Sequence, residues 1–326
     1  MADLPESRVD NAGLFYHTGV DYFGPLYIKE KKLKNRNKVK VYGCVFVCMS
    51  IRVVHIEIVS DLSTEAFLAA FRRFVSHHGN PTHMYSDNGS NFVGANNHLR
   101  ELYMMIRSDD FKLKVSNYAV SKKISWHFNP PISPHFGGLW EAAVKSCKHH
   151  LKRVMGNQLF TYEELCTLAA EIGAILNSRP LWPISPDPND PIALSPAHFL
   201  IGHPYTALPE NDFSAFPDNR LTSWQRVTKT KQEFWRRWQL EYLSELQKRQ
   251  KWIRPNDNIK LDDIVLLIDK NQPCLQWRLG RVVELHPGDD DVVRVVTVKT
   301  SQGSFKRNAR SLCILPVHVE YTQNES

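Results

Sequence analysis

Residues 130–153 read PPISPHFGGLWEAAVKSCKHHLKR, and this stretch decides the fold because it joins a loop of prolines and glycines to an amphipathic helix. The helix is predicted over about 139–155, with apolar residues on one side and a polar stripe of Glu141, Lys145, Lys148 and Lys152 on the other. A glutamate in the first turn of a helix is also favoured by the helix dipole. Glu141 by itself therefore leaves a structural and a functional role open.

The segments around this stretch predict a mixed α/β order. Apolar and β-branched runs indicate strands at 15–23, 41–50, 51–60, 82–86 and 124–128. The strands at 41–50 and 51–60 are expected to be antiparallel neighbours. Helical spacing of apolar residues predicts helices at 63–78, 95–107 and 161–177, the last of them opening with a capping box at Thr161.

The C-terminal part of the chain predicts a different architecture. Prolines are frequent over 180–217, which is typical of an extended arm or a linker. Residues 223–254 form a long helical stretch rich in Trp and Arg, and short β-prone segments over 258–300 indicate a small β-barrel. Within the helix we expect core or oligomer contacts from Trp235, Trp238, Tyr242 and Leu246.

Composition narrows the function classes. The chain has 326 residues, with 41 Lys and Arg against 34 Asp and Glu, so its net charge of +7 suits a polyanionic partner. Its six cysteines are widely spaced, without a CxxC motif, and are predicted to be reduced thiols. Neither a signal peptide nor a membrane span is predicted, and no histidine pair has cysteine partners at zinc spacing. We therefore expect a soluble, intracellular protein without a structural zinc ion.

Three carboxylates stand at the ends of predicted elements. Asp21 and Asp87 each close a strand, and Glu141 opens a helix after the loop. Such carboxylates can converge at one edge of a sheet, where hard cations take oxygen ligands. Two Mg²⁺ ions about 3.5–4 Å apart would then support an in-line phosphoryl transfer. The alternative is that the aspartates cap turns and Glu141 complements a helix dipole.

Three motifs around these acids favour the chemical interpretation. They are HTGVDYFGP at 17–25, YSDNGSNF at 85–92 and WHFNPPISPHFGGLWEAAV at 126–144. Together they resemble the catalytic core of retroelement integrases, and most closely the Pao/BEL group of retrotransposons, over residues 10–205. The resemblance implies an RNase H-like fold and a catalytic triad, formed by Asp21, Asp87 and Glu141, that binds two Mg²⁺ ions with Mn²⁺ as a substitute.

The resemblance also implies DNA contacts. Lys145 and Lys148 match family positions that contact the DNA end of the element, and the alternative is a solvated helix face. Lys152 continues their basic stripe, Asn88 lies in the turn after Asp87, and His135 lies in the loop. The C-terminal strands resemble the SH3-like domain that follows Pao-type cores. Its candidate DNA contacts are Lys306, Arg307 and Arg310.

The predicted fold class is therefore α/β: an RNase H-like mixed sheet flanked by helices, then a helical arm and a small SH3-like β-barrel. The predicted domains are a tail at 1–9, the integrase core at 10–205, a linker at 206–222, a basic helical arm at 223–254, the SH3-like domain at 255–318 and a tail at 319–326. The interval between Asp87 and Glu141 is longer than in retroviral integrases, and no zinc domain precedes the core. A fragment, a truncated copy and a host-captured gene all remain open.

The expected function is metal-dependent 3′-end processing and strand transfer of element DNA into target DNA, in the nucleus after passage through the cytoplasm. Such an enzyme is a polynucleotidyl transferase and endonuclease. Its expected partners are element and target DNA and further copies of the chain, with no membrane and no small-molecule substrate. Two alternatives stay open: a catalytically silent DNA-binding protein of the same fold, and a nuclease without strand transfer.

Overall fold

The computed structural model describes part of the chain, in two compact units. The described residues are 13–30, 37–87, 90–106, 124–128, 149–151, 153–156, 158–184, 193–253, 259–269, 272–290 and 292–315. Only the backbone is described for residues 90, 101–106 and 248–253. The first unit is Met1–Leu176 with Phe213–Lys231, and the second is Asn177–Asp212 with Gln232–Ser326. Within the described residues, every helix is too short or too polar to cross a membrane.

The first unit contains a five-stranded mixed sheet in the order β3-β2-β1-β4-β5. Its strands are β1 (His17–Lys29), β2 (Lys38–Cys48), β3 (Val54–Val59), β4 (His83–Ser86) and β5 (Ser125–Phe128). Strands β1, β2 and β3 pair antiparallel, whereas β4 pairs parallel with both β1 and β5. The predicted mixed sheet and the predicted antiparallel neighbours are therefore confirmed.

The boundary between β2 and β3 differs from the predicted one. The strand expected at 51–60 begins only at Val54, because the preceding residues form a tight turn. Arg52 has a φ of 62° in this turn. Its backbone N–H donates to the carbonyl of Cys48 at 2.8 Å, and the Cys48 N–H donates to the carbonyl of Val53 at 2.9 Å. A left-handed residue ends the extended backbone, so β-branched content alone placed the strand too early.

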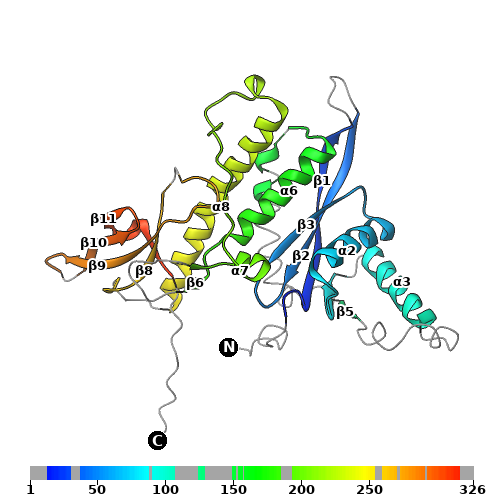
Figure 1. Ribbon diagram of the computed structural model, residues 1–326, viewed down its shortest axis with the longest axis horizontal. Helices are drawn as coiled ribbons and strands as arrows, with labels where there is room; N and C mark the ends of the chain where they lie inside the picture. Colours follow the sequence, from blue (N-terminus) through cyan, green and yellow to red (C-terminus); the bar gives the residue numbers. More distant parts are fainter. Residues whose placement is uncertain are drawn as a thin grey trace, which may run out of the picture. The chain divides into compact units, whose positions relative to one another are not determined.

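Three helices belong to this unit: α2 (Thr64–His78), α3 (Ser90–Ile106) and α6 (Tyr162–Asn177). Helix α3 begins at Ser90, five residues before the predicted start at residue 95. The predicted capping box of α6 is confirmed, because the Thr161 N–H donates to Glu164 Oε2 at 2.8 Å and the Glu164 N–H donates to Thr161 Oγ1 at 3.3 Å. Figure 1 shows β1–β3 between α6 and the α2–α3 pair.

The core of the first unit lies on both faces of its sheet. Positions 43–48 of β2 are all buried, which requires cover on each side of the strand. On one side Phe46 stacks on Phe74 of α2, with ring centroids 4.3 Å apart. Phe74 also makes an edge-to-face contact with Phe15 at 5.0 Å. This aromatic cluster attaches α2 to the centre of the sheet.

The second unit is built around the long helix α8 (Ser223–Ile253), of which it contains the residues from Gln232 onward. Trp235, Trp238 and Leu246 are buried, as the sequence predicts for core residues. The ring of Trp277 contacts those of Trp235 and Trp238 at 5.0 and 5.9 Å. The proline-rich stretch supplies the short strands β6 (Trp182–Pro183) and β7 (Ala193–Leu194) and the helix α7 (Pro196–Ile201).

A five-stranded antiparallel sheet completes this unit, in the order β11-β10-β9-β8-β12. Its strands are β8 (Ile264–Leu267), β9 (Leu279–Pro287), β10 (Val293–Thr300), β11 (Gly303–Asn308) and β12 (Leu312–Ile314). Strands β11 and β12 are its edges, and in the described part of the chain they do not pair. The structure therefore shows an open sheet where a closed barrel was predicted, since barrel closure needs paired edges and β12 has only three residues.

We predict that Phe74→Ala lowers the free energy of unfolding of the first unit by about 3–5 kcal/mol. Its fully buried ring joins α2 to the sheet, and its removal leaves a cavity. Urea unfolding followed by tryptophan fluorescence measures the change. Tyr27→Ala is the control because that side chain is 42% exposed, and it should cost less than about 0.5 kcal/mol. Equal effects of the two substitutions would contradict the assigned core.

Candidate functional site

The parallel pairing of β1 with β4 brings two of the three predicted acids to neighbouring positions. His17 is opposite His83, Thr18 is opposite Met84, and Gly19 is opposite Tyr85. Continuing this register by two residues puts Asp21 of β1 opposite Asp87, the residue that follows β4. Adjacent strands lie about 4.8 Å apart, so this extension of the register places the two residues next to each other on neighbouring strands.

Asp21 lies on the side of the sheet opposite to α2 and α3. Tyr22 contacts Phe67 of α2 and Phe92 of α3, at 6.4 and 5.3 Å between ring centroids. Successive residues of a strand alternate between faces, so Asp21 points to the opposite side. Asp21 is half-buried and its Oδ1 accepts a hydrogen bond from the Tyr22 N–H at 2.7 Å, whereas Asp87 is exposed.

The chain segment that carries the third acid starts at the same edge of the sheet. Strand β5 is parallel to β4, with Ser86 opposite Phe128, so both strands end side by side next to Asp87. The loop and Glu141 follow Phe128 in the sequence and lie outside the described residues. The position of Glu141 relative to the two aspartates therefore stays a prediction.

The donor chemistry of the aspartate pair fits a hard divalent cation. Two carboxylates supply the oxygen ligands that Mg²⁺ prefers, and a third would come from Glu141. Among the residues that the structure describes, no three His, Cys, Asp or Glu side chains are grouped to hold a metal ion. Glu141 lies outside these residues, so a three-carboxylate site stays a prediction.

All five predicted DNA contacts of the core lie outside the described residues. These are Asn88, His135, Lys145, Lys148 and Lys152. Their contribution to DNA binding stays a prediction.

The C-terminal candidates are described, and they do not share a face. In the register of β10 and β11, Lys306 is opposite Thr297, and Arg307 is opposite the buried Val296. Directly opposed residues extend to the same face, so Lys306 and Arg307 point to opposite sides of the sheet. The Arg307 guanidinium lies 5.2 Å from the ring of Phe305. Arg310 is exposed in the 3₁₀ turn after β11.

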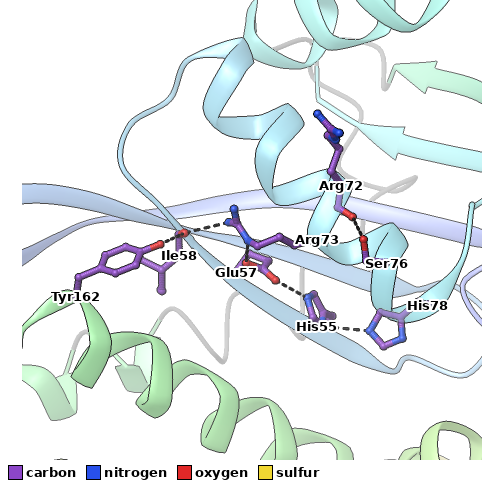
Figure 2. A network of polar contacts seen from close by, with 8 residues as sticks. All are labelled: His55, Glu57, Ile58, Arg72, Arg73, Ser76, His78 and Tyr162. Atoms are coloured by element: carbon purple, nitrogen blue, oxygen red, sulfur yellow. Dashed lines mark hydrogen bonds and ion pairs between the residues drawn. The ribbon is translucent and has the colours of Figure 1, made fainter.

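A second polar cluster joins the edge strand β3 to α2 and α6 (Figure 2). His78 Nε2 lies 3.1 Å from His55 Nδ1, and His55 Nε2 lies 3.0 Å from Glu57 Oε1. The Nε of Arg73 donates to Glu57 Oε2 at 2.7 Å, and the Tyr162 hydroxyl donates to the carbonyl of Ile58 at 3.1 Å. Every group contacts another group of the protein, so this cluster is explained by its structural role of fixing β3.

The charges of this cluster are set by its surroundings. Burial of its ring, together with His55 and His77, lowers the pKa of His78 to about 4. Burial alone would raise the pKa of Glu57, but hydrogen bonds from His55 and Arg73 outweigh it and lower that pKa. At neutral pH the cluster therefore contains a neutral His78 and an ionised Glu57 paired with Arg73.

A group of aromatic side chains near the aspartates was not predicted from the sequence. His17, His83 and His127 come from β1, β4 and β5, and Tyr85 comes from β4. His17 lies four residues before Asp21, and His83 and Tyr85 lie four and two residues before Asp87. His127 is opposite Tyr85. These even spacings put all four rings on one face of the sheet. The spacing His-x-Gly-x-Asp at 17–21 and His-x-Tyr-x-Asp at 83–87 is the signal that would have found them.

Comparison with protein families matches residues 222–315 to a family of unknown function, DUF5641. A comparison with curated proteins found no match. Among solved structures, the chain is similar to one in the cryo-EM structure of the simian T-cell lymphotropic virus intasome in complex with the PP2A regulatory subunit B56 gamma. The sequence identity is 12%, the match covers 98% of this chain and 85% of that chain, and the TM-score is 0.37. A TM-score at this level establishes neither a shared fold nor a function.

We predict that acid destabilises the first unit through His78. The unfolded chain takes up a proton at this residue near pH 6.5, whereas the folded chain does so only near pH 4. The unfolded state therefore binds more protons in this window, and the free energy of unfolding falls as the pH is lowered from 6.5 to 4. Urea unfolding at a series of pH values measures the slope.

The variant His78→Gln removes this titration, so its slope over the same window should be flatter. The exposed His98 provides the control, because His98→Gln should leave the slope of the wild type unchanged. Identical slopes for the wild type and His78→Gln would contradict a neutral, buried His78.

Proposed function

We propose that this chain is a metal-dependent DNA-processing and strand-transfer enzyme of the retroelement integrase type, with a site formed by Asp21, Asp87 and Glu141. The observation that carries the proposal is the register of β1 and β4, which aligns Asp21 with Asp87 at the edge where β5 ends. The three motifs around these acids support it, and they favour the Pao/BEL group among integrases.

The residues of the chain have distinct roles in this proposal. Asp21 and Asp87 would bind one divalent cation between them, and Glu141 would contribute to a second site with Asp21. Bound Mg²⁺ activates an attacking oxygen and stabilises a leaving one in phosphoryl transfer. Asp21 is held in place by the hydrogen bond that its Oδ1 accepts from Tyr22. The exposed Asp87 lies where a phosphate group of DNA can approach.

Binding of the DNA would rest mainly on basic residues. The net charge of +7 favours a polyanion, and Lys145, Lys148, Lys152, Asn88 and His135 are the proposed contacts near the acids. In the second unit Lys306 is the better candidate, because it is exposed and its face of the sheet also carries Lys299, whereas Glu284 and His286 on that face pair with each other. The face of Arg307 includes the buried Val296 and Val298.

We predict that Asp87→Asn abolishes joining of a branched DNA that mimics the integration product. The amide keeps the size of the side chain but removes the charge that would bind the cation. Loss of one electrostatic interaction that stabilises the transition state is expected to lower the rate of joining by at least about 100-fold. Joined and nicked strands are separated on denaturing gels after incubation in Mg²⁺, in Mn²⁺ and in EDTA.

Asp289→Asn is the control for this experiment, because Asp289 is an exposed acid in the turn between β9 and β10. It should join DNA as the wild type does. Cleavage without joining would identify a nuclease instead of an integrase. Binding of DNA without turnover in either metal would contradict the enzyme and leave a catalytically silent DNA-binding protein.

We predict that Lys306 and Arg307 contribute unequally to DNA binding. The logarithm of the DNA association constant falls linearly with the logarithm of the salt concentration. Lys306→Ala should make this slope shallower by about 0.7–0.9, the value for one lost phosphate contact. Arg307→Ala should leave that slope unchanged, because its side chain lies beside Phe305 on the other face. Fluorescence anisotropy with labelled duplex DNA at several salt concentrations measures both. The reverse result would place the DNA on the opposite face.

A further inference from the structure

Three histidine rings lie next to one another across neighbouring strands: His17 stacks on His83, and His83 is hydrogen-bonded to His127. The ring of His17 in β1 lies 4.5 Å from that of His83 in β4, with 9° between their planes. The ring of His83 lies 5.3 Å from that of His127 in β5, with 25° between their planes. His83 Nδ1 and His127 Nε2 are 3.0 Å apart and share a hydrogen bond. The stack therefore runs from a central strand to the edge of the sheet.

Tyr85 connects this stack to the aspartates. Its ring stacks on that of His127 at 4.8 Å with 15° between the planes, and its hydroxyl lies 3.1 Å from His17 Nδ1. Tyr85 precedes Asp87 by two residues, which corresponds to about 6.6 Å along a strand on the same face. We call His17, His83, Tyr85 and His127 the ring row. It starts next to the proposed catalytic edge.

The ring row does not have the geometry of a metal centre. A histidine ligand directs a nitrogen lone pair in the plane of its ring toward the ion, whereas the rings of His17 and His83 are stacked face to face. One nitrogen of His83 and one of His127 are already used in their mutual hydrogen bond. In the described part of the chain, no group of three potential ligands could hold a metal ion. The surface that the row offers to a ligand is therefore the face of an aromatic ring.

His127 is the accessible end of the row. Strand β5 is an edge of the sheet, and His127 is exposed. Within the described residues, its ring contacts and its hydrogen bond all go to His83 and Tyr85 of β4. Partial desolvation and the neighbouring His83 lower the pKa of His127, so the ring is uncharged at neutral pH. An uncharged, exposed ring at the end of a stack can add one more aromatic ring.

We infer that His127, supported by Tyr85, is a stacking site for an unpaired base of the DNA strand next to the reacting phosphate. Bases stack on aromatic side chains whatever their sequence, because every base has a π face. The site lies on the face of the aspartate pair and about two residues from it along the strands. This inference rests on the proposed function, since it names where the DNA strand lies beside the same acids.

The experiment uses the full chain and a branched DNA with 5-iododeoxyuridine at an unpaired position next to the junction. Irradiation should attach the probe to the peptide that contains Tyr85 or the one that contains His127, as identified by mass spectrometry. Crosslinks confined to other peptides would overturn the inference. This readout needs no variant, so it does not depend on whether a substitution disturbs folding.

Affinity measurements provide the second readout. His127→Ala should weaken binding of the branched DNA by about 5- to 100-fold, the range for one lost base contact, and should leave binding of fully paired duplex unchanged. His127→Phe retains an aromatic ring and should bind as the wild type does. Tyr27→Ala removes an exposed aromatic ring elsewhere on β1 and is the control. Equal losses on both DNA substrates would indicate a structural role only and overturn the inference.

The outcomes also separate this inference from the proposed function. Metal-dependent joining without a crosslink at the ring row would refute the stacking site and support the enzyme. A crosslink at the ring row without joining in Mg²⁺ or Mn²⁺ would support the stacking site and refute the enzyme.

Discussion

The parallel pairing of β4 with β1 and β5 is the constraint on which the candidate site depends. Parallel strands run in the same direction, so their carboxyl ends lie at the same edge of the sheet. Alternation of side chains then puts Asp21 and Asp87 on one face, together with Tyr85 and His127. A shift of the β1–β4 pairing by one residue would turn the aspartates to opposite faces. The two carboxylates are therefore neighbours only in this register.

Packing on the opposite face holds that register. Met84 is fully buried there, and Trp126 of β5 contacts Phe67 of α2 and Phe92 of α3 at 5.8 and 6.5 Å. The Nε1–H of Trp126 also donates to Ser86 Oγ at 2.8 Å, which ties β5 to β4 one residue before Asp87. Burial on one face thus fixes the strands, and this leaves the other face for polar residues. The same division explains why Tyr22 packs against the rings of Phe67 and Phe92, whereas its neighbour Asp21 lies on the other side of the strand.

Local signals in the sequence were enough to predict the elements that depend on local interactions. The cap of α2 at Ser63 and the capping box of α6 at Thr161 involve residues three apart, and both form as predicted. The start of β3 was wrong, because the turn at Arg52 is not encoded by β-branched content. The barrel was also predicted wrongly, since closure depends on which edges meet and not on how many strands the chain forms.

The ring row could not be predicted from the sequence, because it depends on contacts between residues far apart in the chain. The hydrogen bond of His83 with His127 spans 44 residues, and the contact of His17 with Tyr85 spans 68. Each of these residues, taken alone, is an ordinary polar residue in a strand. Only the pairing of β1, β4 and β5 makes a stack of them. The aspartates could be predicted from the sequence because the motifs around them resemble those of a known family. The ring row has no such motif.

Under the proposed function, the carboxylates at this edge suit phosphate chemistry better than they suit DNA binding alone. Like charges repel, so two carboxylates on neighbouring strands disfavour each other unless a cation lies between them. They would also repel the phosphates of DNA. In a protein that only binds DNA, they would therefore oppose the attraction that its net charge of +7 provides. A divalent cation reverses both effects, because it attracts the carboxylates and the phosphate to the same point. The neighbouring rings of Tyr85 and His127 can take up a base without adding a charge that would compete for that cation.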